Sequence, residues 1–172
     1  LNFNEGMANT GNITVGAEGV TTSVKQLFVG GLWGESTKEA PAVVMVNPTN
    51  TGNIIVTNVT NANVEGSYIG GIIGKLNVNV SNAQCYAEIR AKGYTNVGWI
   101  MGSVRGTAPF AIDCEVGGTV VQSWDYTDDT PRPFGIDLTN DNYFEYIYGG
   151  TTDWTGITNY DGCKLLESKP KL

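Results

Sequence analysis

The sequence predicts an all-β protein, and within that class a right-handed parallel β-helix, or β-solenoid, of about four short turns with an irregular, aromatic-rich C-terminal cap. Three observations predict it. A short phrase occurs three times, glycine accounts for 23 of the 172 residues, and alternating apolar and polar residues run between the copies of the phrase. The runs of Ala, Leu, Glu and Lys that favour long helices are absent.

The repeated phrase occupies residues 27–34, 67–74 and 95–102, which read LFVGGLWG, SYIGGIIG and TNVGWIMG. Two glycine columns are filled in every copy, and a third column contains Gly31, Gly71 and Trp99. Paired glycines predict a corner, where a Cβ would clash or the backbone takes a positive φ. A bend at this corner lets the aliphatic residues on both sides of the glycines face one interior.

The repeats fill residues 1–121, with copies around 12–34, 53–74 and 77–102 and a partial copy at 108–121. The phrases are spaced by 40 and 28 residues, which places an insertion at 35–50. Strands of period two lie between them, as at Leu76, Val78 and Val80. Units this short suit strands that stack in parallel, so that like columns form ladders. A β-sandwich of antiparallel hairpins is the alternative.

Residues 122–172 differ in texture and are interpreted as a cap that packs on the solenoid within the same domain. Aromatic residues concentrate there, and acidic residues outnumber basic ones by nine to four. The open end of a solenoid exposes unpaired strand edges and apolar core, which a cap must cover.

Composition argues against several functions. The net charge is −7 and no two basic residues are adjacent, whereas nucleic-acid binding needs a basic stripe. No apolar run approaches the ~20 residues that span a bilayer, so we predict no membrane insertion within this chain. Histidine is absent, which excludes a Ser-His-Asp or Cys-His nucleophile within it. The three cysteines match no zinc pattern, and we predict neither a metal nor a cofactor.

At its repeated phrases the chain resembles the GLUG-repeat proteins, a bacterial family of extracellular β-solenoid segments in large surface proteins of Bacteroidota and similar bacteria. Residues 29–34 and 69–74 match the family's pattern of an apolar residue, Gly-Gly, an aliphatic residue, any residue and Gly, and 97–102 departs from it at Trp99. Residues 81–85 (SNAQC) and 112–114 (IDC) resemble the family's Asn/Cys element. The resemblance covers roughly residues 12–120 and implies an extracellular or cell-surface location, with no catalytic residues.

We therefore expect a non-enzymatic structural or adhesive module of a larger bacterial surface protein. Such a rod displays loops, chiefly 35–50 and 124–142, to a glycan or to a host or bacterial surface protein. The chain does not begin with Met, which we interpret as a processed protein or a piece of a longer one, with any export signal upstream.

A carbohydrate-binding module is the first alternative, because sugar faces stack on aromatic rings while carboxylates accept hydrogen bonds from hydroxyl groups. The candidate ligand contacts are Glu145, Tyr146, Tyr148, Asp153, Trp154 and Trp99. The tail residues among them suit a buried strand of the cap equally well.

A polysaccharide lyase or hydrolase is the less favoured alternative. It would use Asp113 and Glu115 on one strand face, with Arg90 and Arg105 on or near neighbouring turns. A separate question concerns Cys85 and Cys114, whose 29-residue separation places them on adjacent turns. There they form either a disulfide or a stack of two small hydrophobic side chains, and we favour the stack.

Overall fold

The computed structural model describes residues 2–3, 6–17, 19–35, 44–57, 59–61, 66–76, 79–91, 94, 96–104, 111–121 and 164–172. Within these residues every regular element is a β-strand and no helix occurs, which confirms the predicted all-β class. The described part accordingly has no helix with the length and apolar character needed to cross a membrane.

The strands fall into four layers, which we define by chain segment as layer 1 (residues 2–35), layer 2 (44–76), layer 3 (79–104) and layer 4 (111–121). Layer 1 contains β1 (Asn2–Phe3), β2 (Ala8–Asn9), β3 (Ile13–Val15), β4 (Thr22–Val24), β5 (Phe28–Gly30) and β6 (Trp33–Glu35). Layer 2 contains β7 (Val44–Val46), β8 (Thr49–Asn50), β9 (Ile54–Val56), β10 (Val59–Asn61), β11 (Tyr68–Gly70) and β12 (Ile73–Leu76). Layer 3 contains β13 (Asn79–Ser81), β14 (Gln84–Ala91), β15 (Val97–Gly98) and β16 (Met101–Val104), and layer 4 contains β17 (Ala111–Ile112) and β18 (Glu115–Val121).

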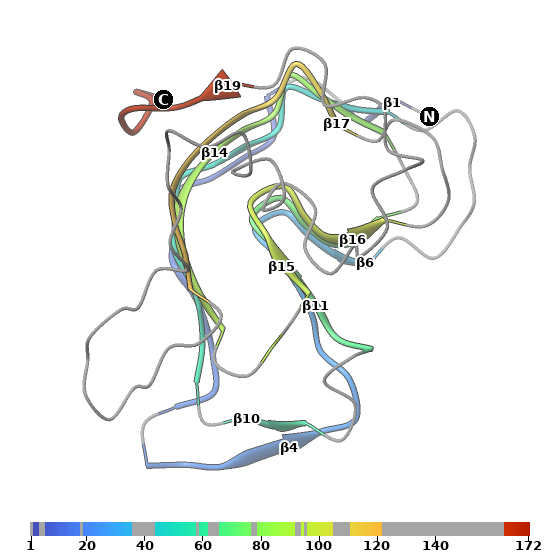
Figure 1. Ribbon diagram of the computed structural model, residues 1–172, viewed down its shortest axis with the longest axis vertical. Coiled ribbons are helices and arrows are strands. Elements are labelled where there is room, and N and C mark those ends of the chain that lie inside the picture. Colours follow the sequence, from blue (N-terminus) through green and yellow to red (C-terminus); the bar gives the residue numbers. More distant parts are fainter. Residues whose placement is uncertain are drawn as a thin grey trace.

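Strands of neighbouring layers pair side by side. Every strand pair in the described residues is parallel, and the strand orders β1-β7-β13-β17, β5-β11-β15 and β6-β12-β16 follow the order of the layers. Strands from different layers therefore lie almost on top of one another in Figure 1. The one antiparallel bridge there, Ala17 with Val20, is an isolated local contact. The sheets are thus not built from antiparallel hairpins.

The layers differ in length. Facing residues are 41 positions apart between layers 1 and 2, 35 between layers 2 and 3, and 31 between layers 3 and 4. One cause is β14, a single strand of eight residues that pairs with both β8 and β9. The predicted insertion at 35–50 was partly wrong, because β7 and β8 lie inside it and pair with β13 and β14.

Each copy of the repeated phrase forms an arch, which is two short strands joined by a two-residue bend. The arches are β5 with β6, β11 with β12, and β15 with β16, and their bends begin at Gly31, Gly71 and Trp99. In Figure 1 the arches stack on one another and point into the space beside β14. The predicted bend is confirmed, and residues on both sides of it, such as Ile69 and Ile72, are buried.

The glycines of the arch permit close approach of backbones. A Cβ on Gly70 would lie 2.7 Å from the Cα of Met101, and one on Gly30 would lie 2.8 Å from the Cα of Ile73. Side-chain carbons do not come this near to backbone atoms, so the two arms of the arch touch through glycine alone. The positive-φ explanation does not apply to these two glycines, which are not among the residues with positive φ.

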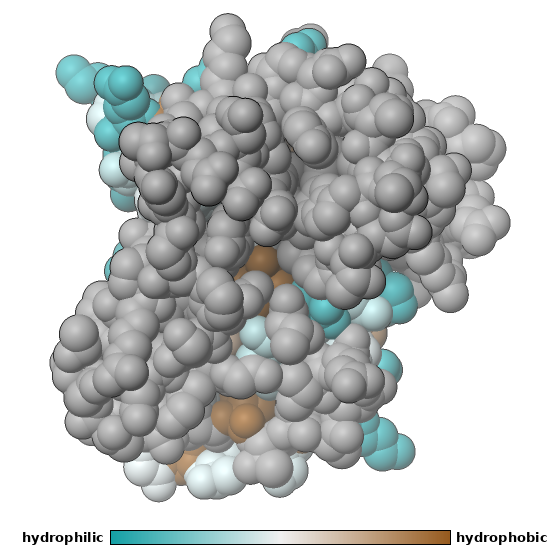
Figure 2. All heavy atoms as spheres, viewed as in Figure 1, coloured by the Kyte–Doolittle hydropathy of each residue, from teal (hydrophilic) through white to brown (hydrophobic). Residues whose placement is uncertain are grey.

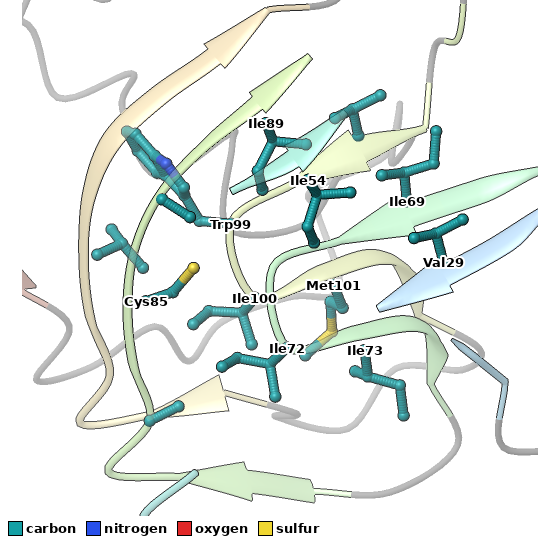
Figure 3. Close-up of a cluster of buried hydrophobic side chains, with 14 of the residues drawn as sticks. Val29, Ile54, Ile69, Ile72, Ile73, Cys85, Ile89, Trp99, Ile100 and Met101 are labelled. Atoms are coloured by element: carbon teal, nitrogen blue, oxygen red, sulfur yellow. The ribbon is translucent and has the colours of Figure 1, made fainter. Parts of the chain in front are cut away.

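The core runs along the stack as ladders of like residues (Figure 3). One ladder joins Val29, Ile69 and Val97, and another contains Ile72 and Ile100; Ile54 and Ile89 face each other across β9 and β14. On the face drawn in Figure 2, brown apolar atoms of the described residues lie in the middle and lower part, and teal hydrophilic residues lie along the margins. Burial of apolar surface along the ladders, at about 25 cal/mol per Å², drives the stacking.

A second column of special geometry lies where β7, β13 and β17 turn toward β8, β14 and β18. Asn47, Asn82 and Asp113 occupy this corner with φ angles of 54°, 50° and 51°, and Gly6 holds the corresponding place in layer 1 with a φ of 86°. Asn, Asp and Gly are the residues that tolerate this left-handed conformation. The corner therefore repeats in every layer although the sequence around it does not.

The C-terminal residues return to the stack. β19 (Lys164–Leu165) pairs in parallel with β18, and the backbone N–H of Leu166 donates to the carbonyl of Val116 at 2.7 Å. The rest of the predicted cap, residues 122–163, lies outside the described residues.

Candidate functional site

The predicted ligand contacts in the tail, namely Glu145, Tyr146, Tyr148, Asp153 and Trp154, lie outside the described residues. Trp99, the sixth candidate, is described and is 1% exposed, at the bend of the third arch. Its ring belongs to the interior cluster drawn in Figure 3. A ligand on the surface therefore finds no exposed face on Trp99, and this side chain contributes to the core.

The carboxylates considered for polysaccharide cleavage do not gather into a site. Asp113 is exposed at the left-handed corner, not on a strand face as we had expected, whereas Glu115 lies on β18 and accepts a 3.5 Å hydrogen bond from Gln84 Nε2. Arg90 forms an ion pair with Glu88, six residues further along the sheet than Gln84, which is about 20 Å at 3.3 Å per residue. Arg105 lies outside the described residues.

The register corrects the predicted alignment of the cysteines. Cys85 faces Val116 across β14 and β18, and Cys114 precedes Glu115, whose N–H donates to the carbonyl of Ala83. The two cysteines therefore do not occupy one column, and both are buried and free of disulfides. The earlier alignment used the 28-residue spacing of the arches, whereas these strands are offset by 31. Two buried thiols are consistent with the small hydrophobic role, although not with a direct stack.

Cys85 instead continues a polar column from layer 1. Asn9 Nδ2 donates to Asn50 Oδ1 at 2.9 Å, and Asn50 faces Cys85 in the next layer. Asn50 and Cys85 are both 0% exposed, and Asn50 Nδ2 is buried without a hydrogen-bond partner of ordinary length. Burial raises the pKa of the Cys85 thiol to about 12, and the neighbouring Asn50 side chain offsets part of the rise. A thiol held protonated in this way is a poor nucleophile.

The most mixed surface chemistry of the described residues lies where the two arms of the stacked arches diverge, and we call it the arch mouth. Phe28 and Tyr68 stack with ring centroids 5.9 Å apart and an angle of 14° between their planes. Lys75 Nζ lies 5.3 Å from the centroid of each ring and 3.5 Å from Glu35 Oε1. All four side chains are partly exposed.

Sequence reasoning missed the arch mouth, because its residues come from both arms of two different copies of the phrase. Phe28 and Tyr68 face each other on β5 and β11, and Lys75 faces Glu35 on β12 and β6. The alignment of the phrases placed Phe28 and Tyr68 in one column, and that signal could have found the aromatic pair. The rings stack on each other and the ammonium group is already paired, so the cluster mainly joins the two arms, with ring edges left for a ligand.

Metal binding has no support among the described residues, since they contain no group of three or more Cys, Asp or Glu side chains placed to hold an ion. Compared with protein-family models, curated proteins and solved structures, the chain matches none significantly. The resemblance to the GLUG repeats therefore rests on the motifs alone.

Proposed function

We propose that the four layers are coils of a right-handed parallel β-helix, and that the chain is a non-enzymatic structural and adhesive module of a bacterial surface protein. The observation that carries this proposal is the recurrence of one corner, one arch and one set of core ladders in successive layers. Repetition of this kind yields a rigid rod whose surface positions are evenly spaced.

Display is the mechanism of such a module. Segment 36–43 joins Glu35 at the end of β6 to the beginning of layer 2, and segment 122–163 joins β18 to β19. The strands at both ends of each segment are paired in the stack. A glycan or a protein partner would therefore meet segments whose anchor points are fixed relative to one another.

The proposal is tested by binding of the purified chain to a panel of bacterial and mucin-type polysaccharides, with product analysis. We expect adhesion without release of reducing ends. We also expect it to survive Asp113→Asn and Glu115→Gln but to be lost when 36–43 is replaced by a Gly-Ser segment of equal length that leaves the melting temperature unchanged. Cleavage that disappears in Asp113→Asn would instead favour the lyase or hydrolase.

A carbohydrate-binding module is the second candidate, favoured by the partly exposed aromatic pair of the arch mouth. Two variants locate such a site. Loss of glycan binding in Tyr68→Ala would place the ligand at the arch mouth, and loss in Trp154→Ala would place it in the tail. The matched control is Phe3→Ala on β1, which belongs to a different sheet from the arches.

A further inference from the structure

Layers 1 and 2 contain the same short element in the same place. Residues 9–15 read NTGNITV and residues 50–56 read NTGNIIV, and the two stretches face each other residue by residue through β2 with β8 and β3 with β9. The copy in layer 2 has a strand on both sides, because β14 follows it. The copy in layer 1 is paired on one side only, since β2 and β3 are end strands of their sheet.

The asparagines of this element form a directional ladder. Asn50 Oδ1 accepts two hydrogen bonds, from the Gly52 N–H at 3.1 Å and from Asn9 Nδ2 of the preceding layer at 2.9 Å. Asn9 Oδ1 accepts the equivalent bond from the Gly11 N–H at 3.2 Å, and the place that an asparagine of a preceding strand would take is open. A carbonyl oxygen has two lone pairs, so Asn9 can accept one more donor.

A second bond of the ladder runs in the opposite sense. The Asn53 N–H donates to Asn12 Oδ1 at 2.9 Å, and the Glu88 N–H donates to Asn53 Oδ1 at 3.0 Å. Each layer thus presents a backbone donor to the asparagine of the layer before it. In layer 1 the residue in that position is Asn12, which is exposed.

Gly11 gives an independent indication of a missing neighbour. A Cβ on its counterpart Gly52 would lie 2.6 Å from the carbonyl carbon of Gly11 in the preceding layer, so glycine is required there. A Cβ on Gly11 would meet nothing closer than 3.7 Å, and Gly11 is not among the positive-φ glycines. Nothing in the described residues requires glycine at position 11, whereas a strand stacked on layer 1 would require it.

We propose that the free edge of β2 and β3 is a docking site for an extended segment of another polypeptide that carries the same Asn-Thr-Gly-Asn-Ile-x-Val element. The segment lies parallel to β2 and β3 and in register with them. Its first asparagine donates to Asn9 Oδ1, and its second accepts from the Asn12 N–H. Docking would bury Thr10 and Gly11, which are exposed, as Thr51 and Gly52 are buried in layer 2. The inference rests on strand pairing and holds whether or not the loops display a ligand.

The probe is a synthetic peptide of residues 7–16 (MANTGNITVG), added to the isotope-labelled, full 172-residue chain. We expect amide shift changes confined to the edge, at Ala8 and Thr14, at peptide concentrations up to about 1 mM. The control peptide carries Asn9→Ala and Asn12→Ala, which removes the ladder and leaves the protein intact.

The protein variants Gly11→Ala and Gly52→Ala form a matched pair. Gly11→Ala should retain the wild-type melting temperature and weaken peptide binding by at least about tenfold, because its methyl group occupies the place of the incoming backbone. Gly52→Ala should destabilise the chain itself. Absence of shifts, equal binding of the control peptide, or unchanged binding by a folded Gly11→Ala would each overturn the proposal. Concentration-dependent dimers that hide the edge from the peptide would also overturn it, in favour of a second copy as the occupant.

Discussion

At the scale of single residues, close approach explains more of this sequence than backbone flexibility does. Gly30 and Gly70 lie where arms of an arch touch, and Gly71 lies where the tip of the arch meets Cys85. Trp99 occupies the same column one layer further on and is buried. The column thus changes from the smallest residue to the largest within one layer. Nothing in the described contacts explains how the interior accommodates the indole there.

Cys85 should make stability depend on pH in the alkaline range. The unfolded thiol loses its proton near pH 9.0, whereas the folded thiol holds it to about pH 12. Between these values the folded state binds more protons, so the free energy of unfolding falls as pH rises, by up to about 1.4 kcal/mol per pH unit. Below pH 9 both states are protonated and the contribution of Cys85 is complete.

Urea unfolding of the wild type and of Cys85→Ala between pH 8 and pH 10.5 checks this expectation. Cys85→Ala should be less stable at pH 8 by about 1 kcal/mol, because a buried sulfur is lost. Its disadvantage should shrink as pH rises past 9, since alanine does not titrate. Other alkaline groups titrate equally in both proteins, so two parallel stability curves would contradict the assignment.

At the scale of elements, the arch is the unit that the sequence predicts best. The glycine columns, the bend and the inward aliphatic residues on both sides of it follow from the three phrases, because a strict geometric demand leaves a strict pattern. The left-handed corner leaves a looser pattern, since Gly6, Asn47, Asn82 and Asp113 satisfy the same φ with three residue types. That corner could not be aligned from sequence.

Register is where sequence reasoning failed. The N-T-G-N element of layers 1 and 2 was a readable repeat, and it was overlooked because the arch dominated the alignment. Later layers do not repeat it, since β14 runs straight through the corresponding place with Cys85 and Ala87. Loops of unequal length shift the arches by 28 residues and the β14–β18 pair by 31 between successive layers. The cysteine pair was misplaced by this difference.

The arch glycines give the sharpest test of an element. Gly70→Ala places a Cβ 2.7 Å from the Cα of Met101, so the third arch must move away from the second. We expect a loss of at least about 2 kcal/mol in the free energy of unfolding, at the upper end of the cost of overpacking. The measurement is urea unfolding followed by circular dichroism.

Gly11→Ala is the control for this variant, because its new methyl group meets nothing closer than 3.7 Å. Replacing glycine by alanine without strain tends to stabilise by reducing the entropy of the unfolded chain. The control should therefore lie within about 0.5 kcal/mol of the wild type, or above it. Equal stability of Gly70→Ala and Gly11→Ala would mean that the arms of the arch do not touch.

At the scale of the whole molecule, stability should depend on position in the stack. In a protein built from layers, each layer is held by its neighbours, and the terminal layer has only one of them. Core positions follow this rule, since Ile13 and Val15 in layer 1 are partly buried whereas Ile54 and Val56 in layer 2 are buried. The open edge that suits a docking segment is thus also the weakest part of the described stack.

Amide hydrogen exchange compares the two layers without a mutation. β3 and β9 differ only in Thr14 against Ile55, so their intrinsic exchange rates are similar. We expect the amides of β9 to exchange at least about tenfold more slowly than those of β3, because opening β9 requires separation from strands on both sides. Exchange of β3 should slow when the peptide of residues 7–16 is present, as layer 1 then has two neighbours. Equal protection of β3 and β9 in the free protein would mean that the stack opens as one cooperative unit, in which case the layer 1 edge would not fray independently of the core.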